Sequence, residues 1–146
     1  MSEYRKSTTN CKDKECLIDA LVEMGYKKEH IEVHDVPQQL YDYHGKPTHY
    51  IDRTGDKANI IVRRQFVGGA ANDLGFKLNP ETGTYDAIIS DYDSGRHNQK
   101  WLSGLKVNYA EKNLIKTSKK MGFKYLGKKM VNGRIQLQWG DNTVRA

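Results

Sequence analysis

Long apolar runs, cysteines and prolines are scarce in this sequence of 146 residues. No apolar run approaches the roughly 20 residues that a transmembrane helix requires, so we expect neither a membrane span nor a membrane partner. The first six residues, MSEYRK, lack the apolar stretch of a signal peptide. The two cysteines, Cys11 and Cys16, cannot build a disulfide framework. We therefore expect a reduced, cytoplasmic setting.

Acidic residues are scarce in the last third of the chain. Residues 1–94 hold 12 Lys and Arg and 16 Asp and Glu, a net charge of −4, whereas residues 95–146 hold 12 and 2, a net charge of +10. Ten excess positive charges attract polyanions, whether nucleic acid, an acidic protein surface or anionic lipid. A solvated lysine-rich helix that only keeps the protein soluble explains the same composition, so both interpretations stay open.

Apolar spacing in the first part of the chain changes from helical to strand-like. Apolar residues recur on one face between Cys16 and Met24, which predicts a helix with Asp13 as its N-cap. We expect the strands at 58–66, 74–78 and 85–90 to form an antiparallel meander. Because the residues of alternate parity in these strands are polar, we expect the second face of the sheet to be exposed. Alternation or strand-like composition predicts strands at 4–9, 31–36, 40–43, 58–66, 74–78 and 85–90.

The C-terminal part reads as a long helix followed by a hairpin. The helix is expected from about Arg96 to about Met121, and the Asn132-Gly133 pair predicts a tight turn between strands at 124–130 and 134–139. Runs of strands broken by only two helices indicate an α+β fold, an antiparallel sheet with two main helices in the order strand, helix, strands, helix, hairpin. No linker or repeat is present, so a single domain over residues 1–146 is expected.

Four segments taken together resemble a known family: IIVRR at 60–64, GGAANDLGF at 68–76, YDAIISDYD at 85–93 and NQKWL at 98–102. From about Tyr4 to Trp139 the chain is similar to the family of the hypothetical chloroplast open reading frame thirty-five. That family is a domain of unknown function in plastids, cyanobacteria, other bacteria and phages. The resemblance implies a cytoplasmic protein of a bacterium, a plastid or an infected host cell. Bacterial members are held to lie beside ATPase genes, which implies an accessory role with an ATPase as candidate partner.

The segment Gly68-Gly69-Ala70-Ala71-Asn72-Asp73 follows a predicted strand and is a candidate phosphate loop. Its backbone N–H groups would face a phosphate, with two arginines close by in sequence. It matches neither the dinucleotide fingerprint nor the Walker pattern, and we favour a glycine-dependent turn. The candidate residues are Arg63, Arg64, Gly68, Gly69 and Asn72.

Asp73, Asp91, Asp93 and His97 are weak catalytic candidates. Two carboxylates at i and i+2 of a strand share a face, so one hard cation would bridge them, with the histidine as general base. We favour the alternative that Asp91 and Asp93 cap the long helix. The spacings of cysteine and histidine do not match a structural zinc site, so no metal and no cofactor are expected.

Aromatic residues lie among the C-terminal cations, a composition typical of single-strand nucleic-acid binding. Trp139 shares one face of its predicted strand with Ile135 and Leu137, which favours burial of the Trp139 side chain. We also expect Phe123 and Tyr125 to be buried. Charge-driven binding is therefore preferred over base readout. The residues expected to bind a polyanion are Lys112, Lys116, Lys119, Lys120, Lys124, Lys128, Lys129 and Arg134.

Three functions are compatible with these patterns. The leading hypothesis is a small, non-enzymatic accessory protein that binds nucleic acid or an acidic protein through the basic C-terminal third. The second is a metal-dependent phosphoester hydrolase that uses the Asp/His cluster. The third is a structural or assembly protein whose sheet edge or face pairs with a partner, and the sequence leaves the oligomeric state open.

Overall fold

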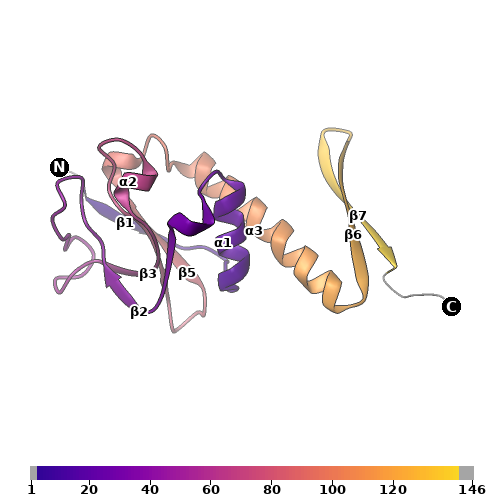
Figure 1. Cartoon of the computed structure of the whole chain (residues 1–146), viewed down its shortest axis with the longest axis horizontal. Helices are drawn as coiled ribbons and strands as arrows, with labels where there is room; N and C mark the ends of the chain where they lie inside the picture. Colours follow the sequence, from indigo (N-terminus) through magenta and orange to yellow (C-terminus); the bar gives the residue numbers. More distant parts are fainter. Residues whose placement is uncertain (1–2, 142–146) are drawn as a thin grey trace. The chain divides into compact units, whose positions relative to one another are not determined.

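The structure is a computed structural model that describes residues 3–141, apart from the side chain of residue 141. Its contacts divide the chain into two compact units, Met1–Tyr109 (unit 1) and Ala110–Ala146 (unit 2). No helix within the described residues is long and apolar enough to cross a membrane. The elements in chain order (Figure 1) are β1 (Tyr4–Ser7), α1 (Lys14–Glu23), the 3₁₀ helix η1 (Lys28–His30), β2 (Ile31–Gln39), β3 (Lys57–Val62), α2 (Arg64–Val67), β4 (Leu74–Leu78), β5 (Tyr85–Ser90), the 3₁₀ helix η2 (Asp91–Asp93), α3 (Gln99–Lys120), β6 (Phe123–Val131) and β7 (Arg134–Asp141).

Unit 1 is built on a five-stranded sheet of order β1-β5-β4-β3-β2 in which every neighbouring pair is antiparallel. The predicted meander is confirmed, because β4 pairs with β3 on one side and β5 on the other. The predicted N-terminal edge strand is also confirmed, since β1 pairs only with β5. With the helices and the separate hairpin, this arrangement confirms the α+β fold class.

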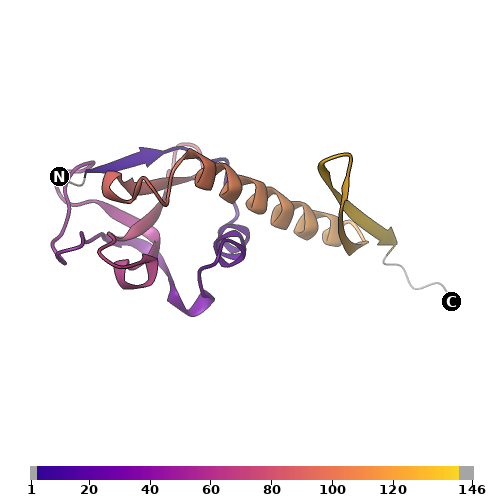
Figure 2. The ribbon, with the colours of Figure 1, turned by 90° about the horizontal axis from the view of Figure 1, so that it is seen from above.

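One face of this sheet carries the main core. The buried residues of α1, among them Leu17 and Leu21, and of the first half of α3, among them Leu105, form one cluster with Ile60 and Phe76 of the sheet. Figure 2 shows this sheet with α1 beside it. Asp13 caps α1 as predicted, since its Oδ1 accepts a hydrogen bond from the Cys16 amide at 3.0 Å. Burying apolar area between the helices and the sheet is the main stabilisation of unit 1.

The second face of the sheet is covered, contrary to the expectation that it is exposed. A second cluster of buried apolar side chains lies there, and it contains Leu40, which is fully buried. Leu40 begins the long connection 40–56 between β2 and β3, and its amide donates to Asp56 O at 2.8 Å. The connection therefore packs on the sheet as an irregular layer, which its polar composition gave no reason to expect.

Two predicted strands are wrong in extent. Residues 40–43 form no strand beyond an isolated bridge of Tyr41 with Pro47. The strand predicted at 58–66 ends at Val62, and Phe66 lies in the short helix α2. Period-two spacing alone therefore misplaced the boundaries of these two strands.

Unit 2 contains the last half of α3 and the hairpin β6–β7. Val131 pairs with Arg134 across the Asn132-Gly133 turn, which confirms the predicted hairpin. A bulge lies between Tyr125 and Gly127, where the register shifts by one residue. None of the described residues 110–140 is buried. Unit 2 thus has no core of its own within this range, and the single domain over 1–146 stays a prediction.

Candidate functional site

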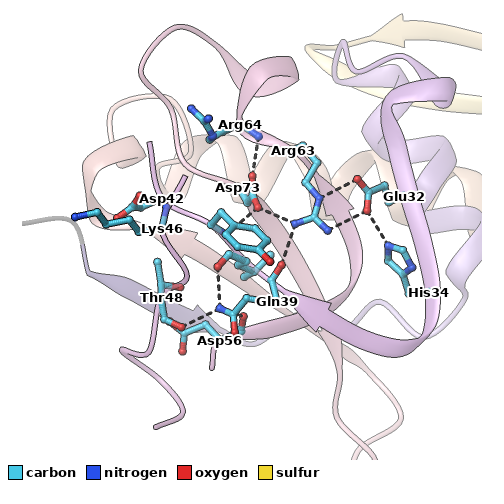
Figure 3. A network of polar contacts seen from close by, with 12 residues as sticks. Glu32, His34, Gln39, Asp42, Lys46, Thr48, Asp56, Arg63, Arg64 and Asp73 are labelled. Atoms are coloured by element: carbon cyan, nitrogen blue, oxygen red, sulfur yellow. Dashed lines mark hydrogen bonds and ion pairs between the residues drawn. The ribbon is translucent and has the colours of Figure 1, made fainter. Parts of the chain in front are cut away.

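A network of polar contacts in unit 1 centres on Arg63, at the end of β3 (Figure 3). Its guanidinium donates to both carboxylate oxygens of Glu32, to Asp73 Oδ2 at 2.9 Å and to Gln39 O at 2.9 Å. The Asp73 carboxylate is almost fully buried and also accepts from the amides of Tyr41 and Arg64, each at 2.8 Å. These bonds connect β2, β3 and the loop before β4, so the network is part of the scaffold.

The network also sets the charge of its surface-facing member. Burial would raise the pKa of Glu32, but hydrogen bonds from Arg63 and His34 outweigh it and hold that pKa below the usual range. His34 Nε2 lies 2.8 Å from Glu32 Oε1. Glu32 therefore stays ionised beside the Arg63 guanidinium, and no local sequence pattern indicates this contact because Glu32 and Arg63 are 31 positions apart.

The residues that we expected to bind phosphate near the loop 68–73 form hydrogen bonds with other protein groups. Asn72 donates its amide to Asp93 Oδ2 at 3.0 Å and accepts from the Tyr43 amide at 2.8 Å. Arg64 Nη1 donates to Tyr43 O at 3.0 Å. At Gly68 an added Cβ would collide with the Arg96 guanidinium, whereas Gly69 faces open space. A side chain at position 68 would therefore require the Arg96 guanidinium to move, and the phosphate-loop role of these residues stays a prediction.

The four weak catalytic candidates lie in different settings. Asp73 belongs to the Arg63 network. Asp93 accepts from Asn72 and lies 3.8 Å from Arg96, with its Oδ1 buried without a hydrogen bond. Asp91 forms an ion pair with Arg5 at 2.7 Å. No group of three or more His, Cys, Asp or Glu side chains within residues 3–141 is arranged to hold a metal ion.

Asp91 and Asp93 do not cap the long helix, contrary to the interpretation that we favoured. Both lie in η2, and Asn98 Oδ1 accepts the Trp101 amide at 2.9 Å in the first turn of α3. An amide oxygen one residue before the helix satisfies one of its free N–H groups. The carboxylates are instead used to bind the loop 68–73 and β1.

His97 is a buried, neutral imidazole. Burial disfavours its charged form and the nearby Arg96 adds repulsion, which together lower its pKa from 6.5 to about 4. Burial likewise raises the pKa of Tyr26 to about 12, so its hydroxyl keeps its proton. That hydroxyl lies 2.5 Å from His97 Nε2, and the two groups form a hydrogen bond. His97 and Asp91 line one cleft of about 190 Å³, which Asp73 and Asp93 do not line.

The C-terminal cations fall on two regular surfaces within unit 2. On α3, Lys112, Lys116, Lys119 and Lys120 follow the spacing i, i+4, i+7, i+8, which places them along one side of the helix. On the hairpin, the register places Lys129 beside Gln136, and the bulge brings Lys124 to the same face. Arg134 shares this face, since it alternates with Gln136 along β7. Lys128 lies on the opposite face and contacts Glu111 at 3.2 Å.

The other face of the hairpin carries apolar side chains together with Lys128. Met130 is 68% exposed and Ile135, its cross-strand partner, is 55% exposed. Tyr125 and Trp139 pair on this face with ring centroids 5.3 Å apart and are half-buried. Phe123 is exposed, so the expectation that it is buried is wrong. The aromatic residues therefore line the face opposite Lys124, Lys129 and Arg134.

Comparison with known proteins gives one match. A family model described as "Protein of unknown function (DUF1257)" matches residues 20–137, which spans most of unit 1 and most of the hairpin. Neither the curated proteins nor the solved structures contain a match to the chain. The match supplies no activity, so a function has to be argued from the geometry of this chain.

Proposed function

The chain belongs to the DUF1257 family, proteins of unknown function, and we propose that it is a non-enzymatic accessory protein that binds a polyanion through unit 2. Within the family, its motifs at 60–76 and 85–102 support a link to the hypothetical chloroplast reading frame thirty-five. That link carries the further proposal of a cytoplasmic protein whose partner is an ATPase or a nucleic acid.

One observation carries the polyanion proposal. Eight cations and one acid, Glu111, occupy the described residues 110–140. Within this range Lys119, Lys120, Lys124, Lys129 and Arg134 make no ion pair. Cations that protein carboxylates do not neutralise are available to phosphates or to the acidic side chains of a partner.

The arrangement favours binding by charge over base readout. Lys112, Lys116 and Lys119 repeat along α3 at one-turn intervals, a spacing suited to successive charges on an extended polyanion. Tyr125 and Trp139 contact each other with their ring planes tilted by 58°, on the hairpin face opposite Lys124, Lys129 and Arg134. Stacked bases and lysine-bound phosphates need both residue types on one face, and among the described hairpin cations Lys128 alone lies on the aromatic face, where it contacts Glu111.

The test is a titration of labelled single-stranded DNA, double-stranded DNA and polyglutamate with the full chain at two salt concentrations. Binding to DNA is expected to weaken as salt rises, with a slope set by the number of phosphates contacted. Replacing five lysines together by glutamine should lower the magnitude of that slope by up to about four on a logarithmic scale. The five are Lys116, Lys119, Lys120, Lys128 and Lys129.

The matched control replaces five exposed lysines of unit 1 by glutamine: Lys12, Lys14, Lys27, Lys28 and Lys46. Both variants lose five charges, so equal weakening would attribute binding to net charge and contradict a role for unit 2. Undetectable binding of both DNA forms at low salt, with polyglutamate bound, would identify an acidic protein as the partner. No binding of any of the three polyanions would overturn the proposal.

A second candidate, an assembly role, rests on the apolar face of the hairpin. Met130 and Ile135 are both more than half exposed, and a two-stranded hairpin is marginally stable by itself. Contact with another protein would cover this face. Light scattering on the full chain tests the homo-oligomeric form, and a monomer at all concentrations would exclude it.

A further inference from the structure

Unit 1 contains a cleft of about 270 Å³ that the proposed function does not use. Its floor is formed by Asp86 and Ile88 of β5, on the sheet face opposite the helices. Its sides are the segment around Ile51 and the turn after β4, from Leu78 to Glu81. The volume is sufficient for a molecule of amino-acid size.

The side of the cleft at Ile51 is held in place by a buried carboxylate. Asp56 is 2% exposed and accepts three backbone hydrogen bonds, from the amides of Tyr50, Ile51 and Asp52, at 2.7–3.0 Å. Gln39 adds a bond from its Nε2 to Asp56 O at 3.1 Å (Figure 3). The cleft therefore has a fixed wall before any ligand enters, which lowers the entropy lost on binding.

Basic and acidic side chains line the cleft together, and Lys77 lies directly across from Asp86 in the register of β4 and β5. Lys6, Lys57 and Lys77 approach from three different strands, and in the part of the chain that the structure describes none of them forms an ion pair. Asp86 is 4% exposed, and its carboxylate has no hydrogen bond among the described residues. A carboxylate that lines the cleft without a protein donor can accept a hydrogen bond from a ligand that enters it.

A ligand of one charge sign does not fit these groups. A simple anion would meet the lysines but also four acidic residues, and a simple cation would meet three ammonium groups beside those acids; the acidic residues that line the cleft are Asp52, Asp56, Glu81 and Asp86. A molecule with separate positive and negative ends satisfies both sets. Ile51, Leu78 and Ile88 add apolar surface beside them.

We propose that this cleft binds a small aliphatic zwitterion, an α-amino acid. Its ammonium group donates to Asp86, its carboxylate accepts from Lys77 and Lys6, and its side chain contacts Ile51 and Ile88. The proposal concerns unit 1 alone and does not depend on the binding of a polyanion by unit 2.

The test is amide NMR of the ¹⁵N-labelled full chain with three matched probes. L-leucine has both charged ends, 4-methylpentanoate lacks the ammonium group and 3-methylbutylamine lacks the carboxylate. L-leucine is expected to shift the amides of residues 51, 77, 86 and 88 saturably and to bind at least about tenfold more tightly than either single-charge probe. Equal affinities for the three probes, or no saturable shift with L-leucine, would overturn the proposal.

Two variants assign the contacts. Asp86→Asn keeps the shape of the side chain and removes its charge, and Lys77→Met keeps the length of the stem. Each is expected to weaken L-leucine binding about tenfold, whereas Lys27→Met, on the surface outside the cleft, should not change it. Because Asp86→Asn alters a buried position, the half-exposed Lys77 gives a second test, and unchanged binding in a folded Lys77→Met protein would contradict the assignment.

Discussion

The two units of this chain differ in what their side chains do. Unit 1 contains every buried residue of the described chain, and most of its buried apolar side chains form one cluster on each sheet face, whereas none of the described residues of unit 2 is buried. Unit 1 has 15 basic and 16 acidic residues, and unit 2 has 9 and 2. In unit 1, polar groups such as those of Arg63 and Asp73 form contacts within the unit. In unit 2, cations and apolar side chains are exposed. The buried core therefore lies in unit 1, and the proposed binding of a polyanion lies in unit 2.

The largest effect should come from the core of unit 1. Phe76→Ala removes a fully buried ring and is expected to lower the free energy of unfolding by about 3–5 kcal/mol. Met130→Ala removes a side chain that is 68% exposed and should change the free energy of unfolding by less than about 0.5 kcal/mol. Urea denaturation followed by circular dichroism measures both. A loss of similar size in the two variants would abolish the distinction between the units.

Breaking the polar network should have the next largest effect. Asp73→Ala leaves Arg63 without one partner and the amides of Tyr41 and Arg64 without an acceptor. Because a half-buried charge and two backbone donors lose their partner, the free energy of unfolding should fall by about 3–4 kcal/mol. The same denaturation experiment tests this, with Asp19→Ala on the exposed side of α1 as the control. An equal, small effect of both substitutions would show that the network is not structural.

The architecture was predictable from local patterns, and the network was not. The helix at 14–23 and the Asn132-Gly133 hairpin follow from spacing and turn residues within a few positions. Glu32, Arg63 and Asp73 meet only because β2 and β3 pair and the loop before β4 returns to them. No pattern within a few neighbouring residues predicts contacts between positions this far apart in the sequence.

The cationic face of the hairpin illustrates the same limit. Lys124 and Lys129 are five positions apart, and strict alternation would place them on opposite faces. The bulge before Gly127, whose φ of 118° is in the left-handed region, inserts one residue and returns them to one face. The glycine was visible in the sequence, but its role as a bulge depends on the register of the partner strand.

Acid should affect unit 1 through His97. Its pKa is about 4 in the folded protein and near 6.5 when unfolded, so the unfolded state binds the extra proton between these values. Stability is then complete above about pH 6.5 and falls as the pH drops towards 4, by about 3 kcal/mol at most. His97→Gln should reduce this dependence, and the exposed His49→Gln should retain it. Unfolding free energies measured from pH 4 to 7.5 test the difference, and parallel curves for all three proteins would contradict it.

The smallest stability effect should occur in unit 2, where binding should change instead. Glu111→Gln removes the carboxylate that contacts Lys128, a pair whose lysine is 41% exposed, so the free energy of unfolding should change by less than about 1 kcal/mol. The same substitution removes the one acid of the described residues 110–140. If unit 2 binds a polyanion, affinity for DNA at low salt should rise about two- to tenfold. Glu29→Gln makes the same charge change on the surface of unit 1, and an equal gain there would mean that the polyanion senses the net charge of the whole chain.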